Sequence, residues 1–207
     1  QPGVMKGSSN NTKGVDFTMS YRKQRVTVGA NINLTETSGN NSPYGDFSAF
    51  SQANPYYRMT NDDGTYDQIL DNFTAAGSTT VTNPLYNSNI GIKDLQRSLS
   101  IASSLNFEYM ILDNLRLTES LQYTRGTART EKFLPANHTS FANETDKTLK
   151  GSYSKNTGES TSWSSNLGLN YNLPINKHLI SMLANWTVSE DRNNYVNLSA
   201  TGYPDRH

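Results

Sequence analysis

The residues that could perform chemistry in this sequence are mainly aromatic side chains in a long polar stretch. The segment ANPYYRMTNDDG, residues 53–64, combines two adjacent tyrosines, an arginine and a turn-forming Asp-Asp-Gly. Tyrosine rings offer an apolar face with a polar tip, and that face suits the C–H face of a sugar ring. Arginine adds a fork of hydrogen-bond donors. These residue types are typical of a binding surface.

Groups suited to catalysis or metal binding are scattered. His138, His178 and His207 lie far apart, without a cysteine or carboxylate cluster at metal-ligand spacing. The segment NDDGTYD (61–67) lacks the acidic spacing and distal glutamate of an EF-hand, which favours a simple turn. Neither a nucleophile elbow nor a phosphate-binding glycine loop is present. We therefore predict no enzyme, no metal site and no cofactor.

The composition favours β structure with large polar surfaces. Only 34% of the residues are hydrophobic and 17% are charged, while 10% are aromatic and the net charge is zero. Because there is no basic excess, we expect no nucleic-acid partner. The absence of cysteine excludes disulfides and thiolate chemistry. No run of apolar residues is long enough for a transmembrane helix.

Apolar residues alternate with polar ones in six segments, which is the period of a β-strand. Short links at 22–25, 111–114 and 172–177 join the segments into three hairpins, whereas long connections at about 36–94 and 127–161 join the hairpins. We predict an all-β, antiparallel fold. The apolar positions are Val15, Phe17, Met19 and Tyr21; Val26, Val28, Ala30, Ile32 and Leu34; Leu99, Ile101, Leu105, Phe107 and Tyr109; Leu115, Leu117, Leu121 and Tyr123; Trp163, Leu167, Leu169 and Tyr171; and Ile180, Met182, Ala184, Trp186 and Val188.

Short connections at one end and long ones at the other are typical of a transmembrane β-barrel. Alternation alone also fits a soluble sheet with one solvated face, but the positions of the aromatic residues favour a membrane barrel. From Trp163 to Tyr171 a tilted strand covers about 20 Å of height, close to the ~25 Å apolar band between aromatic girdles. The girdle candidates are Tyr21, Tyr109 and Tyr171 near the short links, and Tyr123, Trp163 and Trp186 near the long connections.

Two features of the sequence do not fit a regular, closed barrel. Glu119 falls on the apolar phase near the middle of its segment, where a carboxylate is costly in lipid. A bulge would turn Glu119 to the polar face, or a neighbouring subunit would cover it. Six strands cannot close a barrel, because the smallest membrane barrels have eight. Both ends of the sequence look like the interior of a loop, so we expect residues 1–207 to form a partial barrel domain.

The loop segments contain uncommon combinations of residues in a fixed order. They are QPGVMKGSSN (1–10), NSPYGDFSAFSQANPYYRMTNDDG (41–64), NPLYN (83–87), KFLPANHTSF (132–141), KGSYSKNTG (150–158) and SATGYP (199–204). In these segments and in their order, the chain resembles SusC/RagA-like TonB-dependent transporters of Bacteroidetes, whose barrels lie in the outer membrane. The resemblance covers nearly the whole chain and corresponds to the middle portion of the barrel.

The resemblance implies a 22-stranded barrel with an N-terminal plug, in the bacterial outer membrane. It implies import of oligosaccharides or peptides, driven by TonB and assisted by a SusD-like surface lipoprotein that acts as a lid. The plug and the TonB-contacting segment are expected outside this chain. Loop residues would then contact substrate or the lid, or pack the loop against itself. The candidates are Tyr44, Phe47, Phe50, Tyr56, Tyr57 and Arg58.

Two other functions stay open from the sequence. A passive porin-like barrel has the same strand pattern, and an upstream plug would distinguish the transporter from it. A soluble carbohydrate-binding β-sheet module could use the same loop aromatics, and solubility without detergent would favour it. Loop aromatics serve glycans and peptides alike, so the sequence does not name the substrate.

Overall fold

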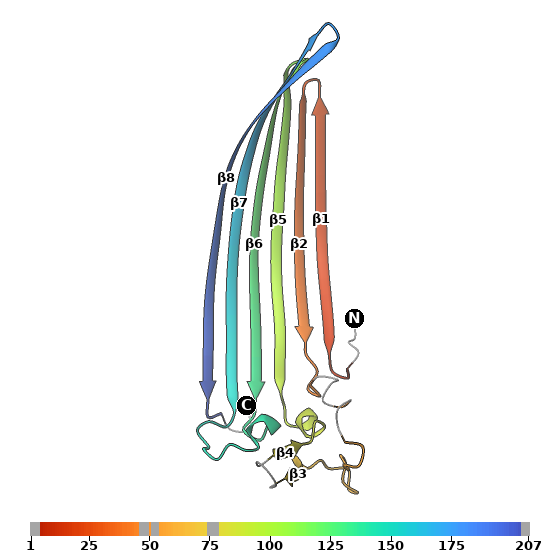
Figure 1. Cartoon of the computed structure of the whole chain (residues 1–207), viewed down its shortest axis with the longest axis vertical. Helices are drawn as coiled ribbons and strands as arrows, with labels where there is room; N and C mark the ends of the chain where they lie inside the picture. Colours follow the sequence, from red (N-terminus) through yellow and green to blue (C-terminus); the bar gives the residue numbers. More distant parts are fainter. Residues whose placement is uncertain (1–4, 46–49, 51–53, 74–78, 204–207) are drawn as a thin grey trace.

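The main element is a six-stranded antiparallel sheet in the order β1-β2-β5-β6-β7-β8 (Figure 1). The structure is a computed structural model that describes residues 5–45, 50, 54–73 and 79–203. The predicted antiparallel all-β fold of three hairpins is confirmed, and β1 and β8 form the edges of the sheet. The strands are β1 (Ser9–Lys23), β2 (Val26–Asn40), β5 (Lys93–Leu112), β6 (Leu115–Leu134), β7 (Ser152–Ile175) and β8 (His178–Thr201).

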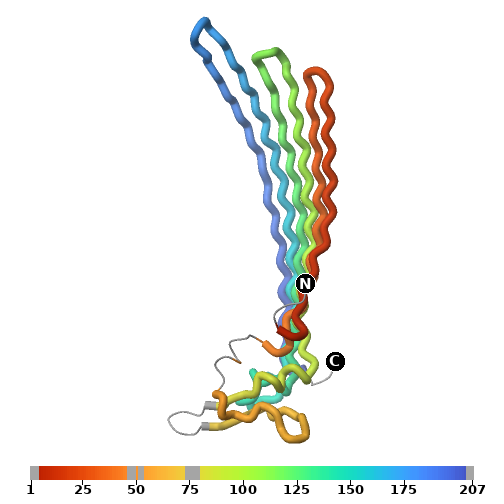
Figure 2. Tube along the Cα trace, turned by 90° about the vertical axis from the view of Figure 1, so that its right-hand side faces the viewer, coloured from red at the N-terminus to blue at the C-terminus, as the bar shows by residue number. Residues whose placement is uncertain are grey.

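Tight turns close the hairpins at the end of the sheet away from the long connections (Figure 2). Gln24 and Asn176 adopt positive φ angles of 51° and 52°, which are common in two-residue hairpin turns. The Arg25 guanidinium donates a 2.9 Å hydrogen bond to the Ile111 carbonyl oxygen and pairs with Asp113 at 2.9 Å. The turn of the first hairpin is therefore tied to the turn of the second.

The strands are longer than the alternation predicted. β6 continues to Leu134 and β7 begins at Ser152, so the second connection is 135–151 rather than 127–161. Likewise, the first connection is 41–92 rather than 36–94. The added strand ends carry polar residues on both faces, so they show no period of two. Threonine-rich backbone still forms the interstrand ladder there.

The hairpin of β7 and β8 projects beyond its neighbours at the short-turn end (Figure 1). The last residue that pairs with β6 is Tyr171, but β7 and β8 remain paired as far as Ile175 and His178. Most of the predicted link at 172–177 is therefore strand. Pro174 is tolerated because β7 has only one neighbouring strand there, so its missing N–H interrupts no second ladder.

The sheet has one apolar and one polar face and almost no enclosed core. Register pairs the predicted apolar positions with one another, for example Val15 with Leu34 and Leu105 with Leu121. Most of these side chains are exposed. In the described part of the chain, the buried apolar side chains are Phe133, with 4% of its surface exposed, and Pro135. Most of the apolar face is therefore exposed on one side of the sheet.

The long connections gather at one end of the sheet (Figure 2). The first contains a small two-stranded sheet of β3 (Ile69–Phe73) and β4 (Thr79–Thr82), followed by the 3-10 helix η1 (Tyr86–Asn89). The second contains the 3-10 helix η2 (Thr139–Phe141). The sequence did not predict these short elements. In the described residues, no helix has the length and apolar character needed to cross a membrane.

Candidate functional site

The apolar face forms a continuous band across all strands of the main sheet. At the long-loop side it gives way abruptly to polar or charged residues at the next position of the same face. The last apolar residues on β1, β2, β5, β6, β7 and β8 are Val15, Leu34, Leu99, Tyr123, Trp163 and Val188; the residues that follow are Lys13, Glu36, Arg97, Arg125, Thr161 and Glu190.

The band is slanted relative to the rows of paired residues. At its short-turn edge it ends at Tyr21 on β1 and at Ile180 on β8. The row of direct partners from Tyr21 reaches Trp186, which is six residues from Ile180. At the other edge the displacement is four residues. A shift of about 13–20 Å over about 24 Å of sheet width corresponds to a slant of about 30–40°. An apolar slab crossed by tilted strands produces this pattern.

The aromatic girdle candidates lie on this face. Tyr123 and Trp163 are direct cross-strand partners, and Trp163 Nε1 donates a 3.1 Å hydrogen bond to Glu190 Oε2 at the edge of the band. Trp186 lies opposite Leu167. On this face of β8 it is one position closer to the middle of the band than Val188. At the short-turn side are Tyr21, Tyr109 and Tyr171.

Glu119 faces the apolar band between Phe107 and Leu167. The pairing of β6 with β7 is continuous from Leu115 to Leu134, so the bulge considered from the sequence is absent. The carboxylate instead accepts a 2.6 Å hydrogen bond from Ser165 Oγ on the neighbouring strand. It therefore keeps one polar partner inside the band.

A polar cavity of about 560 Å³ lies at the long-loop end of the opposite face. Asp94 and Lys132 are direct partners in the sheet, with Nζ 3.9 Å from Oδ2. Asn41 Nδ2 donates a 3.0 Å hydrogen bond to Asp94 Oδ1. No described phenylalanine, tyrosine or tryptophan is among the residues that line it. Its polar lining is Ser8, Asn41, Ser42, Asn87, Asp94, Lys132, His138 and Ser140.

Hydrogen bonds between the two long connections hold the rim of this cavity. Asn87 Nδ2 donates to Thr139 Oγ1 at 2.7 Å, and Thr139 N donates back to Asn87 Oδ1 at 3.1 Å. Gln68 Nε2 donates to the Asn137 carbonyl oxygen at 2.8 Å. Side-chain amides thus join segments that are far apart in sequence into one platform.

Asn83 organises the first connection from within. Its side chain is completely buried, and its Nδ2 donates to the Met59 carbonyl oxygen at 2.8 Å while its Oδ1 accepts from Leu85 N at 3.0 Å. A buried amide with both ends satisfied specifies one loop arrangement, because losing either partner leaves a buried polar group unpaired.

His138 caps η2 and lines the cavity. Its Nδ1 accepts a 3.0 Å hydrogen bond from Ser140 N, so the neutral ring carries its proton on Nε2. Burial, and then the positive charge of Lys132, lowers the pKa of His138. The cavity therefore holds a neutral imidazole donor beside the Lys132 ammonium at neutral pH.

Acidification is expected to loosen this loop. Because the pKa of His138 is lower in the folded loop than its ordinary value of about 6.5, the loop is stabilised above that pH and loses this stability as the pH falls. In the full-length parent protein, the protection factors for amide hydrogen exchange of residues 135–142, which remove the intrinsic pH dependence of exchange, should fall on acidification more than those of other loops. His138→Asn keeps an acceptor for Ser140 N and should remove this extra response. An unchanged pH response in that variant would contradict the assignment.

Among the predicted contact residues that the structure describes, none lines the cavity. Tyr56 is 93% exposed at a loop surface. Tyr57 donates a 3.0 Å hydrogen bond to Asp71 Oδ2, and desolvation followed by Asp71 raises the pKa of its phenol. Tyr44 and Phe50 are half-buried, and Phe47 lies outside the described residues. Tyr57 therefore supports its own loop, whereas Tyr56 is available to a partner.

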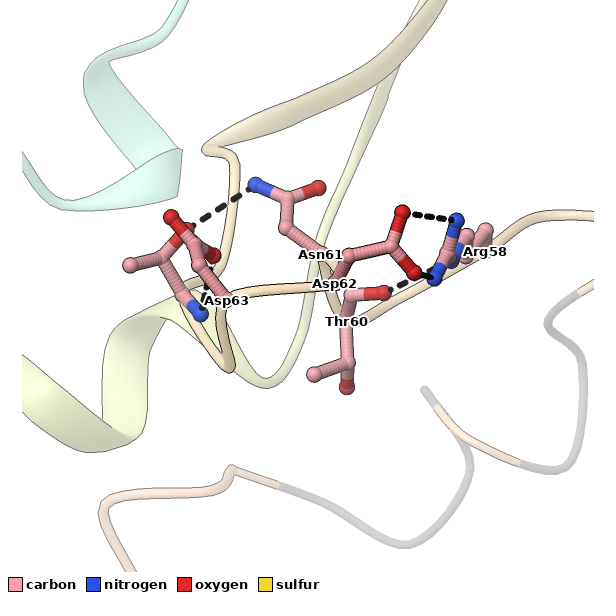
Figure 3. Close-up of polar contacts among 6 residues, drawn as sticks. Arg58, Thr60, Asn61, Asp62 and Asp63 are labelled. Atoms are coloured by element: carbon pink, nitrogen blue, oxygen red, sulfur yellow. Dashed lines mark hydrogen bonds and ion pairs between the residues drawn. The ribbon is translucent and has the colours of Figure 1, made fainter.

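Arg58 is also engaged within its loop (Figure 3). Its guanidinium forms an ion pair with Asp62, and its Nε donates a 3.0 Å hydrogen bond to the Thr60 carbonyl oxygen. Asp63 closes the adjacent turn by accepting a 2.9 Å hydrogen bond from Thr65 N. The interpretation of NDDGTYD as a turn agrees with these contacts, and among the described residues no group of carboxylate or histidine side chains could hold a metal ion.

The cavity residues were missed from the sequence. Asp94 and Lys132 continue the polar phase of their strands, so extending the alternation past the apolar segments would have placed them on one face. Asn87 and His138 carried no such signal, because their position depends on how the two connections dock.

The junction between residues 150–151 and 202–203 closes the second connection against the end of β8. Gly151 has a φ of 76°, and a Cβ there would collide with the Tyr203 carbonyl oxygen. Gly202 N donates to the Lys150 carbonyl oxygen at 3.1 Å. The rings of Tyr203 and Phe133 meet edge to face with centroids 6.3 Å apart.

Gly151→Ala should therefore detach this junction. Gly64→Ala is a matched control, because Gly64 has a φ of 81° but no neighbouring atom within 4 Å of a Cβ. The control should cost only the backbone strain of about 1–2 kcal/mol, and Gly151→Ala clearly more. Limited proteolysis of the full-length parent protein measures both. Equal cleavage rates would show that the contact with Tyr203 is unimportant.

Comparison with solved structures places this fold in a larger barrel. The chain matches part of a chain in a structure of the RagAB peptide transporter, with a TM-score of 0.71 and 15% identity over 95% of this chain and 22% of that one. A structure of the RagAB peptide importer in the "open-open" state matches with a TM-score of 0.67 and 15% identity, over 94% and 22%. No protein-family model matches the sequence, and no curated protein is similar to it.

The six strands therefore have the fold of a portion of the RagA barrel, and this chain spans 22% of the length of the matched chain. The expected resemblance to SusC/RagA-like TonB-dependent transporters is confirmed at the level of the fold.

Proposed function

We propose that this chain is a section of the barrel wall of a TonB-dependent active transporter in the bacterial outer membrane. The observation that carries the proposal is the slanted apolar band. Its slant of about 30–40° agrees with the roughly 35–45° tilt of strands in outer-membrane barrels. The apolar residues then face lipid, the aromatic candidates lie at the two interfaces, and the short turns lie on the periplasmic side.

The polar face would line the interior, and the cavity would lie at its outer mouth. Asn41, Asp94, Lys132 and His138 offer amide, carboxylate, ammonium and imidazole groups there. Extended peptides present alternating donors and acceptors that such groups satisfy. Sugars usually need an aromatic face as well, and none of the described lining residues provides one. We therefore favour a peptide over an oligosaccharide as the cargo, in keeping with the similarity to a peptide transporter.

A SusD-like surface lipoprotein is the proposed partner at the long-loop end. The similar structures are of RagAB, a transporter of two named components. Tyr56 is the best-placed aromatic residue of the predicted set for such a contact, because its side chain is almost fully exposed. TonB would contact parts of the protein outside this chain.

The test uses the full-length parent protein in its native outer membrane. Purification in mild detergent should recover a stoichiometric lipoprotein, and uptake of a labelled peptide mixture by intact cells should stop when a protonophore removes the proton gradient. Uptake that survives the protonophore would indicate a passive pore. Recovery of the parent in the soluble fraction would contradict the membrane assignment itself.

A further inference from the structure

We propose that an arginine cluster on the lipid side of the sheet binds phosphate groups on lipid headgroups of the outer leaflet. The cluster consists of Arg97 on β5, Arg125 and Arg129 on β6, and Arg192 on β8, all on the face that carries the apolar band. The inference rests on the proposed membrane placement and adds an interaction surface that transport itself does not require.

The central pair is unusual for a sheet. Arg97 and Arg129 are direct cross-strand partners, which places their Cα atoms about 4.5–5.5 Å apart. Like charges in that position destabilise a sheet unless an anion lies between them. Both side chains are exposed, and a cleft of about 150 Å³ is lined by these two arginines, Leu95 and Glu131. Arginine forks match the geometry of phosphate oxygens.

The position of the cluster relative to the band selects the anion. Arg125 occupies the first position of this face beyond Tyr123, and Arg97 the first beyond Leu99. Each such step raises the residue by only about 5 Å on a tilted strand. The Arg125 guanidinium therefore lies just outside the aromatic residues, at the level of headgroups, and the pair of Arg97 and Arg129 lies two steps, or about 10 Å, further out. Cargo on the opposite face does not reach them.

The carboxylates of Glu36, Glu131, Glu159 and Glu190 lie on the same surface, but only one of them is within 4.0 Å of an arginine of the cluster. Glu131 Oε2 lies 3.8 Å from the Arg129 guanidinium, and Glu190 accepts the hydrogen bond from Trp163. Glu159 is diagonal to Arg125 and Arg129. In the part of the chain that the structure describes, no carboxylate lies within 4.0 Å of Arg97, Arg125 or Arg192.

The experiment compares lipid binding by the full-length parent protein in phosphatidylcholine nanodiscs. The probe is bisphosphorylated lipid A, with chemically dephosphorylated lipid A as the reference, and bound lipid is counted by native mass spectrometry. The wild type should prefer the phosphorylated lipid. Arg97→Gln with Arg129→Gln should weaken that binding about tenfold. Lys147→Gln with Lys150→Gln removes the same charge from the loop at 135–151 and should leave binding of the phosphorylated lipid unchanged.

Each result decides between the cluster and its alternatives. Equal binding by the arginine variant and the wild type would overturn the proposal, as would equal binding of the two lipids. Displacement of the lipid by inorganic phosphate at the same concentration would also overturn it, because it would show a site for free anions. A parent protein that fails to insert into nanodiscs would refute the proposed membrane placement as well, whereas insertion without lipid preference would refute this inference alone.

Discussion

Leu121→Arg should lower the free energy of unfolding of the membrane-inserted parent protein by about 2–4 kcal/mol, the cost of an arginine facing the middle of a bilayer. Leu121 lies on the apolar face between Leu105 and Ser165, near the middle of the band. Reversible denaturant unfolding in lipid vesicles, followed by tryptophan fluorescence, measures this change.

The neighbouring residue is a matched control. Gln122 lies on the opposite, polar face between Ser104 and Ser164, so Gln122→Arg places the same charge on the same strand in a hydrated interior. It should change the free energy of unfolding by less than about 1 kcal/mol. A similar loss in both variants would mean that the apolar face is not in lipid, and the soluble-sheet interpretation would return.

Ser140→Trp should reduce cargo uptake by about tenfold or more, because an indole would occupy the cavity where the cargo makes its polar contacts. Ser140 belongs to η2 in the second connection, lines the cavity and is exposed there. Uptake of labelled peptides by intact cells, corrected for the amount of protein in the outer membrane, measures the effect.

Lys147→Trp provides the comparison for this variant. Lys147 is exposed in the same connection but does not line the cavity. It should transport normally if the cavity, rather than the loop surface, carries the cargo. Equal inhibition by both variants would indicate that the cargo contacts the lid-facing surface of the loop rather than the cavity.

Much of the fold could be predicted from the sequence, because hydrophobic alternation reports a strand with two different environments. The hairpins, the apolar face and the aromatic positions on it follow from that signal. The prediction failed where the signal is absent. Thr127–Leu134 is strand although it lacks an apolar face, and so is most of the predicted link at 172–177.

The role of the candidate contact residues could not be predicted in this way. Tyr57 and Arg58 looked like contact residues because of their type, yet they are occupied by Asp71 and Asp62 within their own loop. Residue type alone does not distinguish a side chain that supports a loop from one that meets a ligand.

The sequence by itself determined which residues face each side of the sheet, since that choice is local and repeats every two residues. The tertiary structure alone decided the slant of the band, because the slant depends on the register between strands. It also decided the cavity, where Asn41, Asn87, Lys132 and His138 meet from separate segments. Hydrogen bonds between segments that are far apart in the sequence, such as that between Asn87 and Thr139, produce no periodic sequence pattern.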